Sequence, residues 1–378
     1  MKKWKEGGDP CVLCKTPKWL CTLTDVGESQ LGVSRILWNT DTMEKNRAII
    51  KYMVIVPCRQ CMNCRVNYTQ EWKNRLIAEA QQWNENYFVT LTYNDLSLPS
   101  EPVTDPETGE VKTDINGEPV IAHPLVKKHL QDFNKRVRRH WDYQDEHQGI
   151  RIYGIGEYGD QSGRPHYHEI LYNLPLANNL IYMGNRKRTM YGKTVEYNLY
   201  WSQELQDLWP YGQISIGEVN ETTCAYVAGY ALKKHKGKEA ASWYKDRGLT
   251  PEFAIGSRNP GIGMNYFDAH KDSITETESM TIKTAWGGNV VPIPKGFGEA
   301  ARRYSRTDKN GKLIRARYPL EEIDKARADH DAKMPEKMAA AESYYQLLQH
   351  SSTQSIGQTI ESQGNVAEAA ARTKKGVL

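Results

Sequence analysis

The stretch that decides the fold runs Ile150-Arg-Ile-Tyr-Gly-Ile-Gly-Glu157, then Tyr-Gly-Asp-Gln-Ser-Gly-Arg-Pro165, then His166-Tyr-His-Glu-Ile-Leu-Tyr172. Its two outer parts are rich in β-branched and aromatic residues, which favour strands. The middle part is rich in glycine, aspartate and proline, which favour hairpin turns. The sequence therefore predicts two antiparallel strands joined by a turn.

This hairpin carries a candidate metal site. Side chains alternate between the two faces of a strand, so His166 and His168 point the same way and can share one ion. The hairpin returns Glu157 beside both histidines. Two imidazoles and one carboxylate suit a divalent ion such as Mg2+ or Mn2+, which can activate a phosphate. Glu218 is the rival for the third ligand, and the alternative to any metal site is a pair of half-buried histidines.

A second chemical pattern is Tyr226-Val-Ala-Gly-Tyr-Ala-Leu-Lys-Lys234. With 3.6 residues per turn, Tyr226, Tyr230 and Lys233 form one stripe of a helix that is expected to begin near Asn220. A phenol that attacks a phosphodiester needs a neighbouring cation or metal, and two tyrosines would allow two successive transfers. The competing interpretation is that both tyrosines pack the helix on the sheet.

The cysteines form a third pattern. Cys58-Arg-Gln-Cys61-Met-Asn-Cys64 has two successive C-x-x-C spacings, and Cys11-Val-Leu-Cys14 lies upstream. In a cytosolic chain, such spacings indicate thiolate ligation of Zn2+ rather than disulfides. We expect a structural zinc site formed by Cys14, Cys58, Cys61 and Cys64, with Cys11 as the rival of Cys14. A redox role is the other interpretation, but no thioredoxin-like pattern surrounds these residues.

The composition is that of a globular protein. The 378 residues are 39% hydrophobic and 25% charged, with a net charge of +4, which fits a soluble domain rather than a disordered chain. No stretch approaches the roughly 18 continuous apolar residues that a membrane span needs, and the N-terminus lacks the apolar run of a signal peptide. We therefore expect no membrane partner and a location in the cytoplasm. Several separate clusters of Lys and Arg suit a polyanionic partner.

The chain is expected to contain four consecutive segments. These are a cysteine-rich segment over residues 1–66, the main domain over 67–272, a basic extension over 273–320, and a helical and then flexible tail over 321–378. Within them, the patterns predict helices over 67–83, 124–141, 202–208, 220–236 and 323–348, strands over 88–93, 150–157, 166–172 and 213–219, and a loop or hairpin insertion over 98–124. The final twenty-five or so residues are expected to be mobile.

Together the motifs resemble those of the HUH endonucleases. Phe88-Val-Thr-Leu-Thr-Tyr93 resembles their first motif, residues 156–171 resemble their metal-binding motif, and residues 226–234 resemble the motif with the nucleophilic tyrosine. More narrowly, four stretches resemble the replication initiators of gokushovirus-type microviruses: residues 57–65, the helix around Trp72, Trp209-Pro-Tyr-Gly212 and Gly256-Ser-Arg-Asn-Pro-Gly-Ile-Gly263. This resemblance covers about residues 57–267.

The resemblance implies an α+β fold, with a five-stranded antiparallel sheet flanked by helices and with metal and tyrosine on one face. It also implies a rolling-circle replication initiator. In that reaction the tyrosine attacks a phosphate of the viral origin DNA, keeps the 5′ phosphate as a phosphotyrosine ester and releases a 3′-hydroxyl. A host replication helicase and polymerase would then be partners, in the cytoplasm of the host bacterium.

The roles carried over fall on residues already singled out. Glu157, His166 and His168 would hold the ion, and Lys233 would assist the nucleophile. The Tyr-x-x-Lys spacing of single-tyrosine relatives makes Tyr230 the first choice for the initial attack, ahead of Tyr226. Arg164 and Lys234 are expected to contact DNA.

Two other functions compete with this interpretation. One is a different HUH activity, such as that of a plasmid initiator, a conjugative relaxase or a single-strand transposase. The other is a zinc-stabilised DNA-binding protein without catalysis, in which the histidines are structural. In that case loss of His166 would unfold the protein, whereas an enzyme would stay folded and become inactive.

Overall fold

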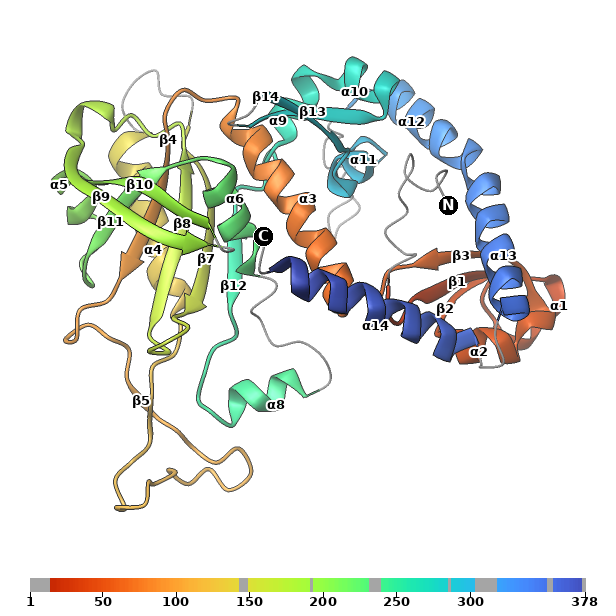
Figure 1. Cartoon of the computed structure of the whole chain (residues 1–378), viewed down its shortest axis with the longest axis horizontal. Coiled ribbons are helices and arrows are strands. Elements are labelled where there is room, and N and C mark those ends of the chain that lie inside the picture. Colours follow the sequence, from red (N-terminus) through yellow and green to blue (C-terminus); the bar gives the residue numbers. More distant parts are fainter. Residues whose placement is uncertain are drawn as a thin grey trace, which may run out of the picture. The chain divides into compact units, whose positions relative to one another are not determined.

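The computed structural model describes residues 14–142, 149–190, 193–230, 239–284, 287–302, 318–351 and 356–375. The chain forms two compact units, whose elements are labelled in Figure 1. The first unit comprises Met1–Tyr68 together with Lys295–Leu378, and the second comprises Thr69–Pro294. Both ends of the sequence thus belong to one unit, a pairing that four consecutive segments do not contain.

The second unit is built on an antiparallel sheet of seven strands in the order β12-β7-β8-β4-β11-β10-β9. The strands are β4 Asn86–Thr92, β7 Arg151–Tyr158, β8 Pro165–Tyr172, β9 Ile181–Met190, β10 Lys193–Trp201, β11 Ile214–Glu218 and β12 Phe253–Gly256. The α+β class and the large antiparallel sheet are therefore confirmed.

The expected number of about five strands is too low. The sequence analysis did not predict β9, β10 or β12. Strand β9 exposes Ile181, Tyr182 and Met183, and it pairs along its length only with β10. It therefore lacks the alternation of buried and exposed residues by which a strand is recognised. Strand β12 has only four residues, too few for a clear period.

One face of the sheet packs on helix α4, Lys127–Trp141. The helix buries Leu130, Phe133, Val137 and Trp141, which recur every three or four residues and so lie on one side. The sheet contributes its own inward-facing side chains to this core, among them Val89, Leu91, Tyr167, Leu171 and Ile216. The amphipathic helix predicted over residues 124–141 is thus present and forms the main core.

The opposite face of the sheet meets the second half of α3, Met62–Ala80, and α6, Glu221–Ala228. From α3, the ring of Trp72 stacks 4.7 Å from that of Tyr153, and the carbonyl oxygen of Leu76 accepts a hydrogen bond of 3.2 Å from Tyr172. Lys73 of α3 and Glu221 of α6 form an ion pair of 2.9 Å. The two helices therefore brace each other over this face.

A close backbone approach fixes the end of β4. A Cβ atom at Gly212 would lie 2.2 Å from the carbonyl oxygen of Thr92, so no other residue fits there without a shift. The fully buried Trp209 donates its indole N–H to the same carbonyl at 2.9 Å. The Trp209-Pro-Tyr-Gly212 turn, which leads from α5, Gln203–Asp207, into β11, thereby positions the strand beside β8.

The other elements of this unit are short. Strands β5 and β6 pair within residues 98–124, as expected for a hairpin insertion, whereas the β13–β14 hairpin was not predicted. Their bounds and those of the remaining helices are β5 Glu101–Pro102, β6 Ile121–Ala122, α8 Ala240–Lys245, α9 Met264–Ala269, α10 Lys271–Thr277, β13 Ser279–Thr284 and β14 Gly287–Pro292.

The first unit contains a three-stranded antiparallel sheet in the order β2-β1-β3. Its core combines residues from both ends of the sequence, including Trp19, Met53, Tyr345 and Leu348. The elements are β1 Lys18–Leu23, α1 Asp25–Leu31, β2 Arg35–Trp38, α2 Thr40–Lys45, β3 Ile50–Val56, α11 Lys295–Ala301, α12 Leu320–Ala332, α13 Met334–Ser351 and α14 Ile356–Lys375.

The C-terminal tail corrects two expectations. The single helix expected over residues 323–348 is two helices, α12 and α13. The expected flexible tail is helix α14 over Ile356–Lys375. Ile356 and Ile360 of α14 are buried in the core of the first unit. Because only a few apolar residues anchor an otherwise polar helix, its composition resembles that of a mobile segment. Among the residues that the structure describes, no helix combines the length and apolarity needed to cross a bilayer.

Candidate functional site

Glu157, His166 and His168 meet on the face of the sheet that α6 covers. The β7–β8 register places Glu157 opposite His166 and Ile155 opposite His168. The Nε2 atoms of His166 and His168 lie 3.3 Å and 3.4 Å from Oε1 of Glu157. One potential ligand atom from each residue lies within 4.8 Å of the other two. The structure therefore assembles the group of one carboxylate and two imidazoles that the hairpin predicts.

The hydrogen bond of His166 defines its free nitrogen. Its Nδ1 lies 3.1 Å from the carbonyl oxygen of Arg164, and a carbonyl can only accept. Nδ1 therefore carries the hydrogen, which leaves the lone pair of a neutral ring on Nε2. That lone pair faces the carboxylate of Glu157, which is also an acceptor. A cation between them, either a proton or a metal ion, satisfies both atoms.

His168 is oriented by two residues of β4. Its Nδ1 lies 2.9 Å from the hydroxyl of Thr90, and its ring stacks on Phe88 with centroids 5.4 Å apart and planes at 10°. These contacts direct Nε2 toward Glu157. The sequence analysis did not assign a role to Thr90. Its signal was the alternation of Phe88, Thr90 and Thr92, which puts the three side chains on the face that carries the histidines.

Tyr226 of α6 completes the group. Its hydroxyl donates to Oε1 of Glu157 at 2.5 Å and lies 3.2 Å from Nε2 of His168. Helix α6 begins at a reciprocal cap, because Asn220 accepts from the amide of Thr223 while the Thr223 hydroxyl accepts from the amide of Asn220,. Tyr230 is half-buried and follows α6 by two residues. Lys233 and Lys234 lie outside the described residues.

The charge of Glu157 is set by its partners. Burial raises the pKa of this carboxyl, but hydrogen bonds with His166, His168 and Tyr226, together with the charge of His168, lower it by more. The net pKa is well below its ordinary value. A buried, ionised carboxylate needs compensating positive charge, and a bound divalent ion would supply it.

The other two residues considered for this region lie at different distances from the group. Arg164, in the β7–β8 turn, donates to the carbonyl of Tyr93 at 3.1 Å and pairs with Asp95 at 2.7 Å, so it stands at the rim beside His166. Glu218 instead accepts a hydrogen bond of 3.1 Å from Asn198, and it opposes Tyr87 in the sheet. The structure therefore does not bring this rival ligand to the histidines.

Cys14, Cys58, Cys61 and Cys64 form a second group of potential ligands, in the first unit. Three pairs of their sulfur atoms lie 3.5–3.9 Å apart, and none of the four is in a disulfide. Tetrahedral zinc with Zn–S bonds of about 2.3 Å requires sulfur atoms about 3.8 Å apart. The spacing therefore fits a four-thiolate zinc site.

The surroundings of these cysteines favour thiolates. Backbone amides donate to sulfur: that of Cys58 to Cys14 at 3.3 Å, and that of Cys61 to Cys58 at 3.3 Å. Hydrogen bonding from Cys14, the largest contribution, helps to lower the pKa of Cys61 to about 6. Cys11, the rival of Cys14, lies outside the described residues. Cys224 is buried on α6, and burial raises its pKa to about 12.

Comparisons with known proteins agree with these motifs. A family model for replication-associated proteins of the ORF2 type matches residues 86–235, which contain the β4 motif, the hairpin and both tyrosines. Replication-associated protein ORF2 of Spiroplasma virus 4 is 30% identical over 249 residues, or 66% of this chain and 68% of that protein.

Two further relatives carry similar names. Replication-associated protein VP4 of Bdellovibrio phage phiMH2K is 29% identical over 204 residues, or 53% of this chain and 56% of that protein. Replication-associated protein ORF4 of Chlamydia phage 1 is 29% identical over 259 residues, or 67% of this chain and 55% of that protein. The chain thus spans little more than half the length of these two relatives. No solved structure matches the chain.

Proposed function

The chain belongs to the family of microvirus replication-associated proteins, and from this premise we propose that it is a metal-dependent endonuclease that nicks origin DNA through a tyrosine. The observation that carries the proposal is the position of the Tyr226 hydroxyl, 2.5 Å from Oε1 of Glu157 and 3.2 Å from Nε2 of His168. A nucleophile and a set of metal ligands thus meet at one point, as phosphoryl transfer requires. The nick would start rolling-circle replication of a circular phage genome.

The proposed step is a transesterification. The phenolic oxygen bonds to the scissile phosphorus, the bond from phosphorus to the 3′ oxygen breaks, and one proton passes in net from the phenol to the leaving oxygen. The 5′ phosphate stays on the protein as a tyrosine ester and the DNA gains a free 3′-hydroxyl. Because one phosphodiester replaces another, the same chemistry in reverse can rejoin a strand.

The geometry favours Tyr226 for the first attack, whereas the Tyr-x-x-Lys spacing favours Tyr230. The Tyr226 hydroxyl is within hydrogen-bond distance of two members of the ligand group. Glu157 accepts the phenolic hydrogen, so it lies where it can help to remove it. Tyr230, one helical turn later in sequence, would then carry the second transfer, which resolves the new junction. Lys233 keeps its proposed role of assisting the nucleophile.

Each metal site follows from the chemistry of its donors. Glu157, His166 and His168 would hold Mg2+ or Mn2+ through one carboxylate oxygen and two imidazole nitrogens, with further positions left for phosphate oxygens and water. Bound there, a divalent ion supplies a Lewis acid that polarises the phosphate. Cys14, Cys58, Cys61 and Cys64 would hold a structural Zn2+. We also propose that Arg164 and Lys234 contact the DNA backbone and that host replication proteins act after the nick, in the host cytoplasm.

The test is a covalent adduct. Purified protein would be incubated with Mn2+ and end-labelled single-stranded oligonucleotides tiled across the parent replicon, then separated under denaturing conditions. We expect a metal-dependent adduct on the 5′ phosphate side that Tyr226→Phe abolishes, a loss of about 10⁴-fold or more because no other group replaces the nucleophile. Tyr230→Phe is the matched control and should still form the first adduct.

The opposite results are equally informative. If Tyr230→Phe abolishes the adduct and Tyr226→Phe does not, the order of the two tyrosines is reversed. If the wild-type protein binds the oligonucleotides but forms no adduct with any divalent metal, the nicking proposal is wrong. A DNA-binding protein without catalysis would then explain the histidines better.

A further inference from the structure

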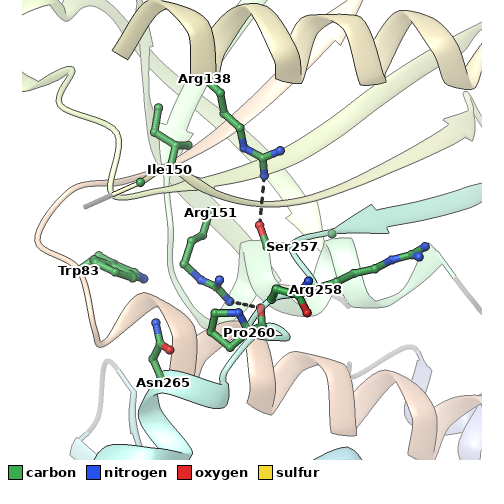
Figure 2. A pocket seen from close by; sticks show the side chains of 11 residues that line it. Trp83, Arg138, Ile150, Arg151, Ser257, Arg258, Pro260 and Asn265 are labelled. Atoms are coloured by element: carbon green, nitrogen blue, oxygen red, sulfur yellow. Dashed lines mark hydrogen bonds between the residues drawn. The ribbon is translucent and has the colours of Figure 1, made fainter. Parts of the chain in front are cut away.

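A pocket of about 500 Å³ lies toward the end of β7 where the strand begins, away from the candidate active site. Trp83, Arg138 and Asn265 contribute to its walls, together with the start of β7 and the loop over residues 256–260 (Figure 2). Arg151 in this pocket and Glu157 in the active site are six residues apart on one strand. At about 3.3 Å per residue, the two regions are about 20 Å apart.

A buried ion pair builds the base of this pocket. Arg151 pairs with Glu79 of α3, and its Nη2 donates to the carbonyl oxygens of Pro260 at 2.9 Å and Gly261 at 3.1 Å. Glu79 also accepts hydrogen bonds from the amide of Gly263 at 2.5 Å and from the indole N–H of Trp83 at 3.0 Å. One pair of charges thereby fixes both the loop and the tryptophan. The pocket is part of a rigid framework rather than a gap beside a loose loop.

Two other arginines give the pocket positive charge. Arg138 reaches from α4 to donate to the Ser257 hydroxyl at 3.3 Å, and Arg258 is exposed on the loop (Figure 2). In the part of the chain that the structure describes, neither has an ion pair with a carboxylate. Arg258 extends from the loop on the side away from Trp83 (Figure 2). An anion can therefore be met both inside the pocket and across the loop.

These side chains match the parts of a nucleotide. The half-buried indole of Trp83 offers a face on which a base can stack, and the amide of Asn265 can donate to and accept from a base edge. Arg138 and Arg258 suit phosphate oxygens, which guanidinium groups bind through charge-assisted hydrogen bonds. A volume of about 500 Å³ is within the usual range for ligand sites.

We propose that this pocket binds one nucleotide of single-stranded DNA, with its base against Trp83 and Asn265 and with backbone phosphates on Arg138 and Arg258. The proposal rests on the proposed function, for which it supplies a second grip about 20 Å from the scissile phosphate. A strand is a better occupant than a free nucleotide because cations lie on both sides of the loop, and only a strand continues past the bound base with a further phosphate. The grip would hold the strand in register while Tyr226 attacks.

The first test measures binding without catalysis. A fluorescein-labelled oligothymidylate of about twenty nucleotides, long enough to span both regions, would be titrated with the full chain in EDTA at several KCl concentrations. A single-strand phosphate contact contributes about 0.7 to the slope of log affinity against log salt. We expect Arg258→Ala to weaken binding and to reduce the slope by about 0.7. Arg139→Ala, which removes an exposed charge from α4 outside the pocket, should leave the slope unchanged.

The second test identifies the base contact. Oligothymidylate that carries 5-iododeoxyuridine would be cross-linked by light, and the modified peptide would be identified by mass spectrometry. We expect a cross-link at Trp83 that Arg258→Ala diminishes and that excess dTMP does not displace. Thermal melting of both arginine variants, followed by circular dichroism, controls for folding.

Each opposite outcome overturns the proposal. These outcomes are equal salt slopes for Arg258→Ala and Arg139→Ala, cross-links that map only outside the pocket, or displacement of the cross-link by dTMP, which would indicate a free nucleotide. Because binding in EDTA needs no metal or nucleophile, these results stand apart from the adduct assay. Loss of the adduct with intact pocket binding counts against the nicking function alone.

Discussion

The two ligand groups are held by different kinds of scaffold. The carboxylate and two histidines come from adjacent strands of one sheet, within twelve positions of each other, and their register is set by the β7–β8 ladder. The four cysteines instead join Cys14, ahead of β1, to Cys58 after β3 and to Cys61 and Cys64 around the start of α3. The first group exists because the sheet is formed, whereas the second links segments that are distant in sequence.

The donors differ as much as the scaffolds. Four thiolates fill a tetrahedral zinc ion and leave no position for a substrate, which is the pattern of structural sites. Two imidazoles and one carboxylate leave positions open, and the hydroxyl of Tyr226 lies at that opening. One group is thus suited to hold the chain together and the other to act on a ligand. This contrast predicts opposite consequences when a ligand is removed from each.

The largest expected effect is on folding of the first unit. Cys58→Ser removes one thiolate, and structural zinc contributes on the order of 10 kcal/mol to small folded zinc domains. We therefore expect loss of bound zinc and unfolding of the first unit at a much lower temperature, measured by metal analysis and by thermal melting. Cys224→Ser is the matched control, because Cys224 is buried away from the cluster, and it should keep the zinc. Retention of zinc and of melting temperature by Cys58→Ser would contradict a structural role.

The second effect is on catalysis alone. His168→Ala removes a ligand from a site whose scaffold, the β7–β8 ladder, does not depend on the metal. We expect adduct formation to fall by about 10³-fold, more than the 10- to 100-fold typical for loss of a group that only orients a ligand. The melting temperature should change little. Should His168→Ala unfold the protein instead, the histidines are structural and the contrast between the two groups disappears.

The third prediction separates a ligand from the residue that orients it. Thr90→Val keeps the size of the side chain but removes the hydroxyl that lies 2.9 Å from Nδ1 of His168. Metal affinity should fall by about 10- to 100-fold, measured as the Mn2+ concentration needed for half-maximal adduct. Thr92→Val is the control, since the Thr92 hydroxyl donates to the carbonyl of Gln213 instead. Equal effects of the two variants would argue against orientation of His168 by Thr90.

The same contrast explains what the sequence could predict. The hairpin group was predictable because alternation and turn chemistry act over a few residues, so His166, His168 and Glu157 needed no knowledge of distant contacts. Glu218 seemed a rival only because its distance from the histidines depends on sheet order. The cysteine motif was visible, but the choice between Cys11 and Cys14 depends on how distant segments meet.

Other features had no local signal. Helix α14 was mistaken for a flexible tail because its partners, such as Trp19 and Met53, lie at the other end of the sequence. The Gly256–Gly263 motif was noticed, but its use in a pocket depends on Arg151 and Glu79, which fix the loop from β7 and α3. Local patterns thus predicted the ligands, whereas tertiary contacts decide what surrounds them.

The smallest expected effect concerns how firmly α6 presents Tyr226 to the sheet. Asn220→Ala removes the cap that accepts from the amide of Thr223, and loss of such a cap costs about 1 kcal/mol. For a unit of this size we expect a decrease of about 2–4 °C in melting temperature. Adduct formation should slow only a few-fold, because the ion pair between Lys73 and Glu221 still holds the first turn of α6. Asn220→Asp, which can cap equally well, should restore both quantities. If instead Asn220→Ala leaves the melting temperature unchanged but slows the adduct as much as His168→Ala does, α6 forms part of the chemistry rather than a support for Tyr226. The division between a rigid ligand sheet and a separately held nucleophile would then have to be abandoned.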